Sequence, residues 1–89
     1  MAALRAQINE LDTTLIGLLA RRARFIDRAM ELKVLNGWPA RIPERVEEVI
    51  NNARKAARQE GIDPELVEAL WRRLVEWSIA RETQVLREV

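Results

Sequence analysis

Positively charged side chains lie on or beside the apolar faces of the predicted helices, where charge is unusual. They are Arg5, Arg22, Lys33, Arg41 and Arg45. Guanidinium groups bind carboxylates through two hydrogen bonds, and lysine supplies a compact charge. A pocket that combines three or four of these groups suits a small dianion. The competing interpretation is that such residues are exposed and bind nothing, and it is strongest for Arg41.

Arg22 stands out because it interrupts an apolar seam in the first predicted helix. The seam steps by fours and threes, as in a coiled coil, through Leu4, Ile8, Leu11, Leu15, Leu18, Arg22, Phe25, Ala29 and Leu32. A desolvated lone charge is costly unless a counter-charge accompanies it. We therefore expect an anion to meet Arg22.

Lys33 and Arg5 differ in their distance from Arg22. Lys33 follows Arg22 by eleven residues, which returns it to nearly the same helix face about 16 Å further along the axis. These two side chains can therefore line one elongated pocket. Arg5 lies about 25 Å from Arg22 along a straight helix, too far for both to hold one small ligand. If Arg5 serves a site, it serves the site of another subunit.

Start and stop signals divide the chain into three helices. Glycine follows two apolar-periodic segments, and proline opens the second and the third, with Asp63 as an N-cap. The expected helices run from Leu4 to about Leu35, from Pro43 to Gly61 and from Pro64 to about Arg87. No strand pattern, repeat or linker interrupts them. We predict one all-α domain over residues 1–89, with one long, one short and one medium helix.

The second and third predicted helices each have an apolar side. In the second it contains Val46, Val49, Ile50, Ala53 and Ala57, and the opposite face is expected to be solvated: Glu47, Asn51, Arg54, Lys55 and Arg58. In the third, the inner side is expected to contain Leu66, Val67, Leu70, Trp71, Leu74, Trp77, Ser78 and Val85. Ser78 and Glu82 make a polar step there. That step is either a helix edge or part of a site.

The length of the first helix predicts an oligomer. A helix of about 30 residues is about 45 to 50 Å long, whereas a compact chain of this size has a radius of gyration near about 12 Å. One copy cannot surround such a helix. We expect a dimer in which the long helices pair.

Composition excludes several classes of chemistry. The chain has no cysteine and no histidine, which excludes disulfides, thiolate nucleophiles, histidine bases and ordinary zinc sites. The net charge of +1 with interspersed signs argues against a nucleic-acid partner. No segment has the length and apolarity of a membrane span, and the N-terminus lacks a signal-peptide pattern. We expect a cytoplasmic protein without a membrane partner.

Two groups of motifs stand out along the chain. In the first helix they are Leu4-Arg5, Ile8, Leu11-Asp12, Leu15, Leu18-Leu19-Ala20, Arg22 and Lys33. Downstream they are Ile42-Pro43-Glu44-Arg45-Val46, Gly61-Ile62-Asp63 and Trp77-Ser78-Ile79-Ala80. Together these motifs resemble those of the all-helical chorismate mutases, and the downstream ones are similar to the isochorismate-pyruvate lyase branch in particular. The resemblance covers nearly the whole chain.

The resemblance implies an intertwined homodimer with two equivalent sites, each completed by Arg5 of the opposite chain. It implies that Arg22 and Arg45 hold substrate carboxylates. Lys33 and Glu82, the implied catalytic pair, would address the ether oxygen of the breaking carbon–oxygen bond. The full candidate substrate-binding set is Arg5, Arg22, Lys33, Arg41, Arg45, Ser78 and Glu82. A pericyclic rearrangement of this kind needs no metal, nucleophile or cofactor.

Two departures from the family pattern leave the reaction open. Glu82 stands where many relatives carry glutamine, and a carboxyl group donates a hydrogen bond only when protonated. Val46 stands where typical mutases carry a glutamate for the ring hydroxyl, and Ile42 replaces a nearby polar residue. Conversion of chorismate to prephenate is therefore the first hypothesis. Formation of salicylate and pyruvate from isochorismate is the second, and a non-catalytic interaction domain is the third.

Overall fold

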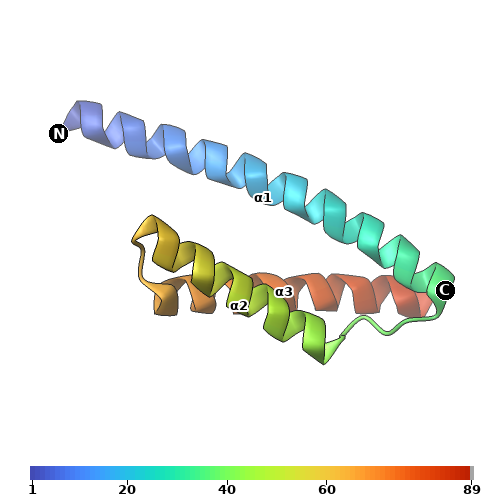
Figure 1. Ribbon diagram of the computed structural model, residues 1–89. Helices are drawn as coiled ribbons and strands as arrows, with labels where there is room; N and C mark the ends of the chain where they lie inside the picture. The colour runs from blue at the N-terminus through green and yellow to red at the C-terminus, as the bar shows by residue number, and fades with distance from the viewer. Residues whose placement is uncertain (89) are drawn as a thin grey trace.

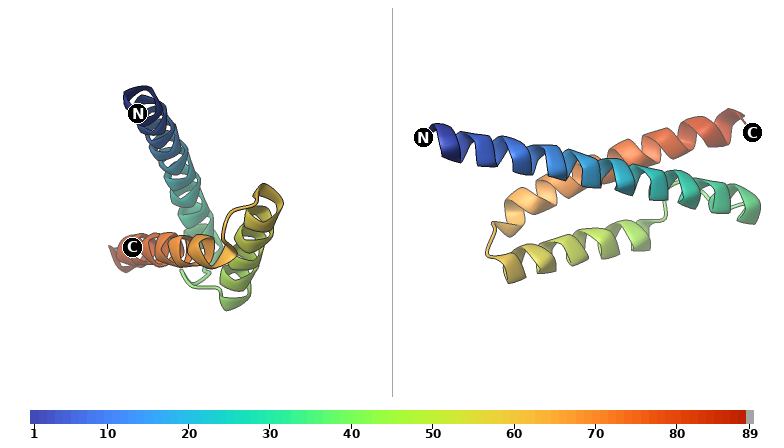
Figure 2. Two further views of the ribbon diagram at one scale, coloured as in Figure 1. Left: turned by 90° about the vertical axis from the view of Figure 1, so that its left-hand side faces the viewer. Right: turned by 90° about the horizontal axis from the view of Figure 1, so that it is seen from above.

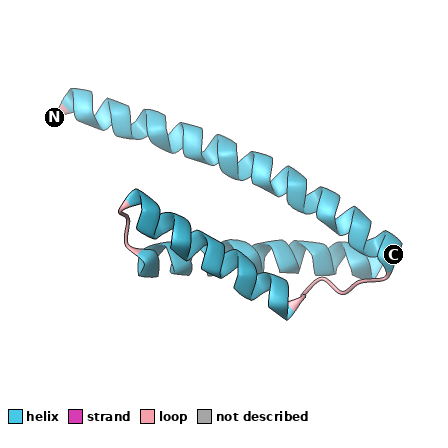
Figure 3. Ribbon diagram, viewed as in Figure 1, coloured by secondary structure: helices cyan, strands magenta, loops and turns pink. Residues whose placement is uncertain are grey.

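The protein is built from three α-helices and the two loops between them. A computed structural model describes residues 1–88, and the side chains of residues 1–84, with no strand in that range (Figure 1, Figure 3). The helices are α1 (Ala2–Asn36), α2 (Pro43–Glu60) and α3 (Pro64–Glu88). The predicted all-α class is confirmed. The side chain of Val85, expected on the inner side of α3, lies outside the described residues.

Glycine ends α1 and α2 as the sequence predicted. Gly37 and Gly61 have φ angles of 67° and 72°, in the left-handed region that costs glycine least. In each case the next residue closes the helix: the Trp38 amide donates to the Lys33 carbonyl at 2.9 Å, and the Ile62 amide donates to that of Ala57 at 3.0 Å. This pairing satisfies carbonyl groups at the helix end that lack intrahelical partners.

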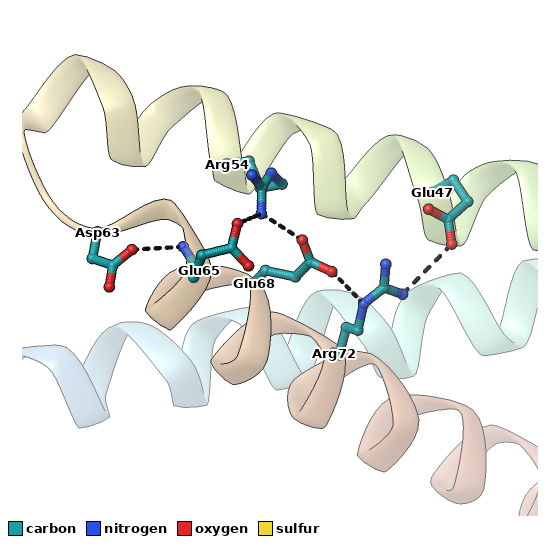
Figure 4. Close-up of polar contacts among 6 residues, drawn as sticks. All are labelled: Glu47, Arg54, Asp63, Glu65, Glu68 and Arg72. Carbon is teal, nitrogen blue, oxygen red and sulfur yellow. Dashed lines mark hydrogen bonds and ion pairs between the residues drawn. The ribbon is translucent and has the colours of Figure 1, made fainter.

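Proline and aspartate define the helix starts. Pro43 opens α2 after Ile42, whose backbone is extended, because proline disfavours the helical conformation of the residue before it. At the start of α3 the Asp63 carboxylate accepts a hydrogen bond from the Glu65 amide at 2.9 Å (Figure 4). Asp63 is thus the predicted N-cap.

The core lies between α2 and α3, which run side by side (Figure 1, Figure 2). Its buried apolar residues are Ile50, Ala53, Ala57, Val67 and Val75. Trp71 packs against the cluster of Ala53, Ala57 and Val67. The small alanine side chains let the two helices approach closely. The predicted apolar side of α2 is confirmed by these positions.

The inner side of α3 was predicted too broadly. Leu66, Leu70 and Trp77 are all about half exposed, whereas Val75, absent from the prediction, is buried. The short helix α2 covers only a narrow stripe of α3, so the remaining apolar residues are only partly covered within the chain. Figure 2 shows α1 passing on another side of α3 rather than over this stripe.

The predicted solvated face of α2 was partly wrong. Arg54 forms ion pairs with Glu65 at 3.0 Å and with Glu68 at 2.6 Å (Figure 4). Arg72 pairs with Glu68 at 2.8 Å and with Glu47 at 3.5 Å. These ion pairs alternate in sign and connect α2 with α3. They lie at the edge of the helix pair, where apolar burial ends.

Helix α1 stands largely apart from this pair. Its 35 residues span about 52 Å at the usual rise, which equals the longest extent of the molecule, 52 Å. None of its residues is fully buried, and Phe25 of the seam is 69% exposed. Figure 1 shows α1 diverging from α2 and α3 toward its N-terminus. The radius of gyration, 15.8 Å, exceeds the value of about 12 Å for a compact chain of this length.

No helix in the described part of the chain combines the length and hydropathy that crossing a bilayer requires.

Replacing Glu68 by glutamine should lower the melting temperature at neutral pH, because Arg54 and Arg72 lose their shared acceptor. The hydrogen bonds from Arg72 and from Arg54 hold the pKa of Glu68 below its usual 4.5. A depressed carboxyl pKa contributes stability above the unfolded pKa, and that contribution disappears as the pH falls through the native pKa. Thermal melts should therefore show a difference between wild type and Glu68→Gln near neutrality that shrinks as the pH falls below 4.5.

The matched control is Glu10→Gln, which removes the same charge from an exposed position of α1 that makes no ion pair among the described residues. It should leave the melting temperature nearly unchanged. A Glu68→Gln difference that persists well into the acid range would contradict this account.

Candidate active site

A pocket of about 180 Å³ opens where the C-terminal half of α1 approaches α3. Its lining comes from every element of the chain. Helix α1 supplies Arg22, Ile26, Ala29 and Lys33; the loop supplies Ala40 and Ile42; α2 supplies Arg45, Val46 and Val49; and α3 supplies Val75, Ser78, Ile79 and Glu82. Five of the seven candidate site residues therefore line one space: Arg22, Lys33, Arg45, Ser78 and Glu82.

The Lys33 ammonium group is the central contact of the pocket. It donates one hydrogen bond to the Glu82 carboxylate at 2.6 Å and another to the Ala40 carbonyl at 2.7 Å. Glu82 is only 3% exposed, so this ion pair is nearly closed to solvent on the α3 side. An ammonium group has three protons, which leaves one donor for a ligand.

Arg22 and Arg45 bring two positive charges to the same pocket. Arg22 is partly buried and makes no ion pair among the described residues, whereas Arg45 binds the neighbouring Glu48 on its own helix. The pKa of the Arg22 guanidinium is lowered, first by desolvation and then by the charge of Arg45. Both causes disfavour the charged form of Arg22. A bound anion would offset the repulsion from Arg45. The expectation of an anion at Arg22 rests on the same physics.

Ser78 is buried, and its hydroxyl donates to the Leu74 carbonyl of its own helix at 2.9 Å. The proton is therefore used within α3. The lone pairs of the oxygen are free to accept a hydrogen bond. Ser78 is part of the pocket rather than only a helix edge.

The rest of the lining is mainly branched and aliphatic: Ile26, Ile42, Val46, Val49, Val75 and Ile79. Such walls exclude water, and charges in a low-dielectric space interact more strongly than they do in water. They also offer apolar contacts to a ligand. The arrangement can bind a small molecule that combines an apolar ring with two negative groups.

Two candidate residues lie outside the pocket. Arg41 is exposed and pairs with Glu76 of α3 at 2.7 Å, and this hydrogen bond raises its pKa. Arg5 is exposed on the N-terminal part of α1, about 25 Å along the helix from the pocket residue Arg22. Arg41 therefore ties the loop to α3, and Arg5 reaches no site of its own chain.

Sequence reasoning missed Ile26 and Val75 in the apolar lining of the pocket, although it had named Ala29, Ile42, Val46 and Val49. The residues of α1 that line the pocket, Arg22, Ile26, Ala29 and Lys33, step by four, three and four. The seam drawn through Arg22 instead continued through Phe25 and Leu32, which do not line the pocket. Because Arg22 and Lys33 were already placed on nearly the same face, a step of four from Arg22 toward Lys33 would have identified Ile26. On α3 the set Val75, Ser78, Ile79 and Glu82 follows the same helical spacing.

The model of one protein family, described as chorismate mutase type II, matches residues 4–83. The chain belongs to this family. The predicted resemblance is confirmed, and the pocket contains four of the five residues to which the resemblance gave a role, Arg22, Lys33, Arg45 and Glu82. These are the residues expected to hold a chorismate-type ligand.

Similar members of the chorismate mutase family come from several kinds of protein. The T-protein of Enterobacter agglomerans is 35% identical over 92% of this chain but only 22% of its own length. The chorismate mutase of Methanocaldococcus jannaschii is 27% identical over 99% of this chain and 89% of its own. The isochorismate pyruvate lyase of Pseudomonas aeruginosa is 28% identical over 99% of this chain and 86% of its own length.

This chain thus spans about a fifth of the length of the T-proteins that it matches. No solved structure matches it significantly.

Replacing Arg22 by glutamine should not destabilise the ligand-free protein, and should raise its melting temperature slightly. The change removes a partly desolvated charge and its repulsion from Arg45. Thermal melts of Arg22→Gln and of Arg24→Gln, an exposed arginine of the same helix, provide the comparison. Added salt should reduce the increase in melting temperature of Arg22→Gln, because salt screens the repulsion between Arg22 and Arg45 in the wild type. A marked loss of stability in Arg22→Gln alone would mean that Arg22 is structural.

Proposed function

We propose that this protein is a chorismate mutase, which converts chorismate to prephenate. The observation that supports this most is the convergence of Arg22, Lys33 and Arg45 on one aliphatic pocket in a chain of this family. Chorismate carries two carboxylates and an enolpyruvyl ether on a ring. Three cations and branched aliphatic walls match both parts of that molecule.

The reaction is an intramolecular rearrangement in which the ether carbon–oxygen bond breaks while a carbon–carbon bond forms. Its electrons move in a ring, so no group of the protein has to attack the substrate. The protein accelerates the reaction by holding the enolpyruvyl group over the ring and by stabilising charge on the ether oxygen. In our proposal Arg22 and Arg45 bind the carboxylates, and the remaining Lys33 proton faces the ether oxygen.

Glu82 supports this mechanism through Lys33. As a carboxylate it accepts the Lys33 hydrogen bond at 2.6 Å, which fixes the ammonium group on the α3 side of the pocket. Protonated, it would itself become a donor to the ether oxygen. As a carboxylate it only orients the Lys33 ammonium group, and the donor to the ether oxygen is then another Lys33 proton.

We propose that the enzyme is a homodimer in which Arg5 enters the pocket of the other chain. Arg5 lies about 25 Å along α1 from Arg22. The apolar residues of α1 near it, Leu4, Ile8 and Leu11, are largely exposed. A second copy that covered them would also carry Arg5 toward another pocket and add a cation for the dianion.

The second candidate is an isochorismate-pyruvate lyase. It is favoured by Ile42 and Val46, which give the pocket aliphatic walls and no carboxylate for a ring hydroxyl in a chain 28% identical to such a lyase. In that reaction a ring hydrogen moves to the enolpyruvyl carbon as the carbon–oxygen bond breaks, which gives salicylate and pyruvate. The same cations would serve this substrate.

Purified protein should convert chorismate to prephenate. The measurement is the decrease in chorismate absorbance. Lys33→Ala should lower kcat/KM by about 10²- to 10³-fold, as expected for loss of a donor to developing negative charge. Its circular dichroism should retain the helical signal. Lys55→Ala, at an exposed position of α2, should keep wild-type activity.

Isochorismate, offered separately, tests the second candidate through salicylate fluorescence. Salicylate without prephenate formation would replace the mutase proposal by the lyase. Turnover of neither substrate would contradict both and favour a non-catalytic interaction domain.

Mixing inactive Arg5→Ala and Arg22→Ala chains should restore activity if sites are shared. Each heterodimer then contains one intact site and one doubly altered site, so random exchange should give about a quarter of wild-type activity in a symmetric dimer. The control mixture of Arg22→Ala with Lys33→Ala should stay inactive when both residues act within one chain's site. Failure of the first mixture, despite subunit exchange verified by mass, would exclude sharing of Arg5.

A further inference from the structure

An ion pair outside the pocket connects α1 with α3. The Arg81 guanidinium binds the Asp27 carboxylate through two hydrogen bonds, of 2.6 Å from Nε and 3.1 Å from a terminal nitrogen. The same guanidinium lies over the Trp77 ring at 5.5 Å from its centre. A bidentate pair of this kind is directional, because the planar donor and acceptor must face each other.

The pair lies immediately beside the pocket. Asp27 follows the pocket residue Ile26, and Arg81 precedes Glu82. Along α1, Asp27 lies about 7.5 Å beyond Arg22 and about 9 Å before Lys33. A displacement of α1 at this point therefore moves both cations relative to Glu82.

Apolar packing alone does little to fix the position of α1 on α3. The helix has no buried residue, and in the described part of the chain its side chains bond beyond α1 only at Asp27 and Lys33. Lys33 is itself a site residue, and its hydrogen-bond partners change when a ligand accepts one of its hydrogen bonds. Asp27 and Arg81 lie outside the pocket lining, so a ligand leaves their pair intact.

Each member of this pair favours the charged form of the other. The hydrogen bond from Arg81 lowers the pKa of the Asp27 carboxyl, and the same bond raises the pKa of Arg81. The nearby Arg28 pairs with Glu31 on α1 rather than with Asp27.

We propose that Asp27 and Arg81 are positioning residues that set the register of α1 on α3 and so hold Arg22 and Lys33 at the spacing that the dianion needs. This inference rests on the proposed function for its kinetic readout. A shift of about one ångström in a catalytic group can cost up to about 100-fold in rate. The pair therefore contributes to turnover without touching substrate.

Asp27→Asn tests the proposal, with Glu31→Gln as the matched control. Both changes remove one carboxylate of α1 and break one arginine pair, but only the Asp27 pair reaches another helix. Asp27→Asn should lower kcat/KM by about 10-fold or more, with KM raised and kcat lowered, at a temperature well below its melting point. Glu31→Gln should stay within about twofold of wild type, since exposed pairs within a helix are weak.

A double-mutant cycle separates positioning from a general loss of charge. Arg81→Gln should reproduce the defect of Asp27→Asn, and the double variant should be no worse than either single one, because all three lack the same pair. Additive losses would overturn the proposal. A purely structural role would lower the melting temperature and leave kcat/KM of the folded enzyme unchanged, which would also overturn it.

Hydrogen exchange provides a readout independent of activity. Amides of residues 22–36 should exchange faster in Asp27→Asn than in wild type or Glu31→Gln, while those of α2 keep their protection. If wild type turned over neither substrate, the proposed function would fail, yet this measurement would still decide the role of the pair. Unchanged exchange in α1 would overturn the inference.

Discussion

The hydrogen bonds of Lys33 are the interaction on which the site depends. One ammonium group joins α1 to Glu82 of α3 and to the Ala40 carbonyl of the loop. These three segments form the pocket only while they stay together, because α1 buries no residue of its own in this chain. A nearly buried carboxylate without a cation would be costly. The hydrogen bond between Lys33 and Glu82 thus both connects the helices around the pocket and orients the ammonium group of Lys33.

The charges of the chain divide into two groups with different partners. Along the α2–α3 edge, opposite charges alternate and satisfy one another, from Arg54 through Glu68 to Arg72. In the pocket, Lys33 pairs with Glu82 and Arg45 pairs with Glu48, whereas Arg22 has no ion-pair partner among the described residues. Desolvation and the charge of Arg45 both disfavour its charged form, and an anion bound at Arg22 would offset them. The firm α2–α3 pair provides the framework on which such a site can be maintained.

Local signals in the sequence predicted the helices well, because glycine, proline and Asp63 act through their own backbone neighbours. They also identified Arg22 and Lys33, since a cation on an apolar helix face is informative without any partner. Contacts between helices were harder. The pairs of Arg54 and Arg41, and the bond of Asp27 to Arg81, depend on how α1, α2 and α3 lie together. Helical periodicity cannot give that relation, and a seam displaced by one residue selected Phe25 instead of Ile26.

The exposed apolar residues of α1 and α3 connect the fold to the proposed assembly. Leu15 and Phe25 of α1 and Leu70 and Trp77 of α3 are each at least 46% exposed, more apolar surface than a small single chain usually leaves open. Covering it would add a core that α2 and α3 alone lack. The same contact would bring a distant Arg5 to a second pocket. In the proposed dimer, the surface of α1 that would stabilise the assembly would also complete the site.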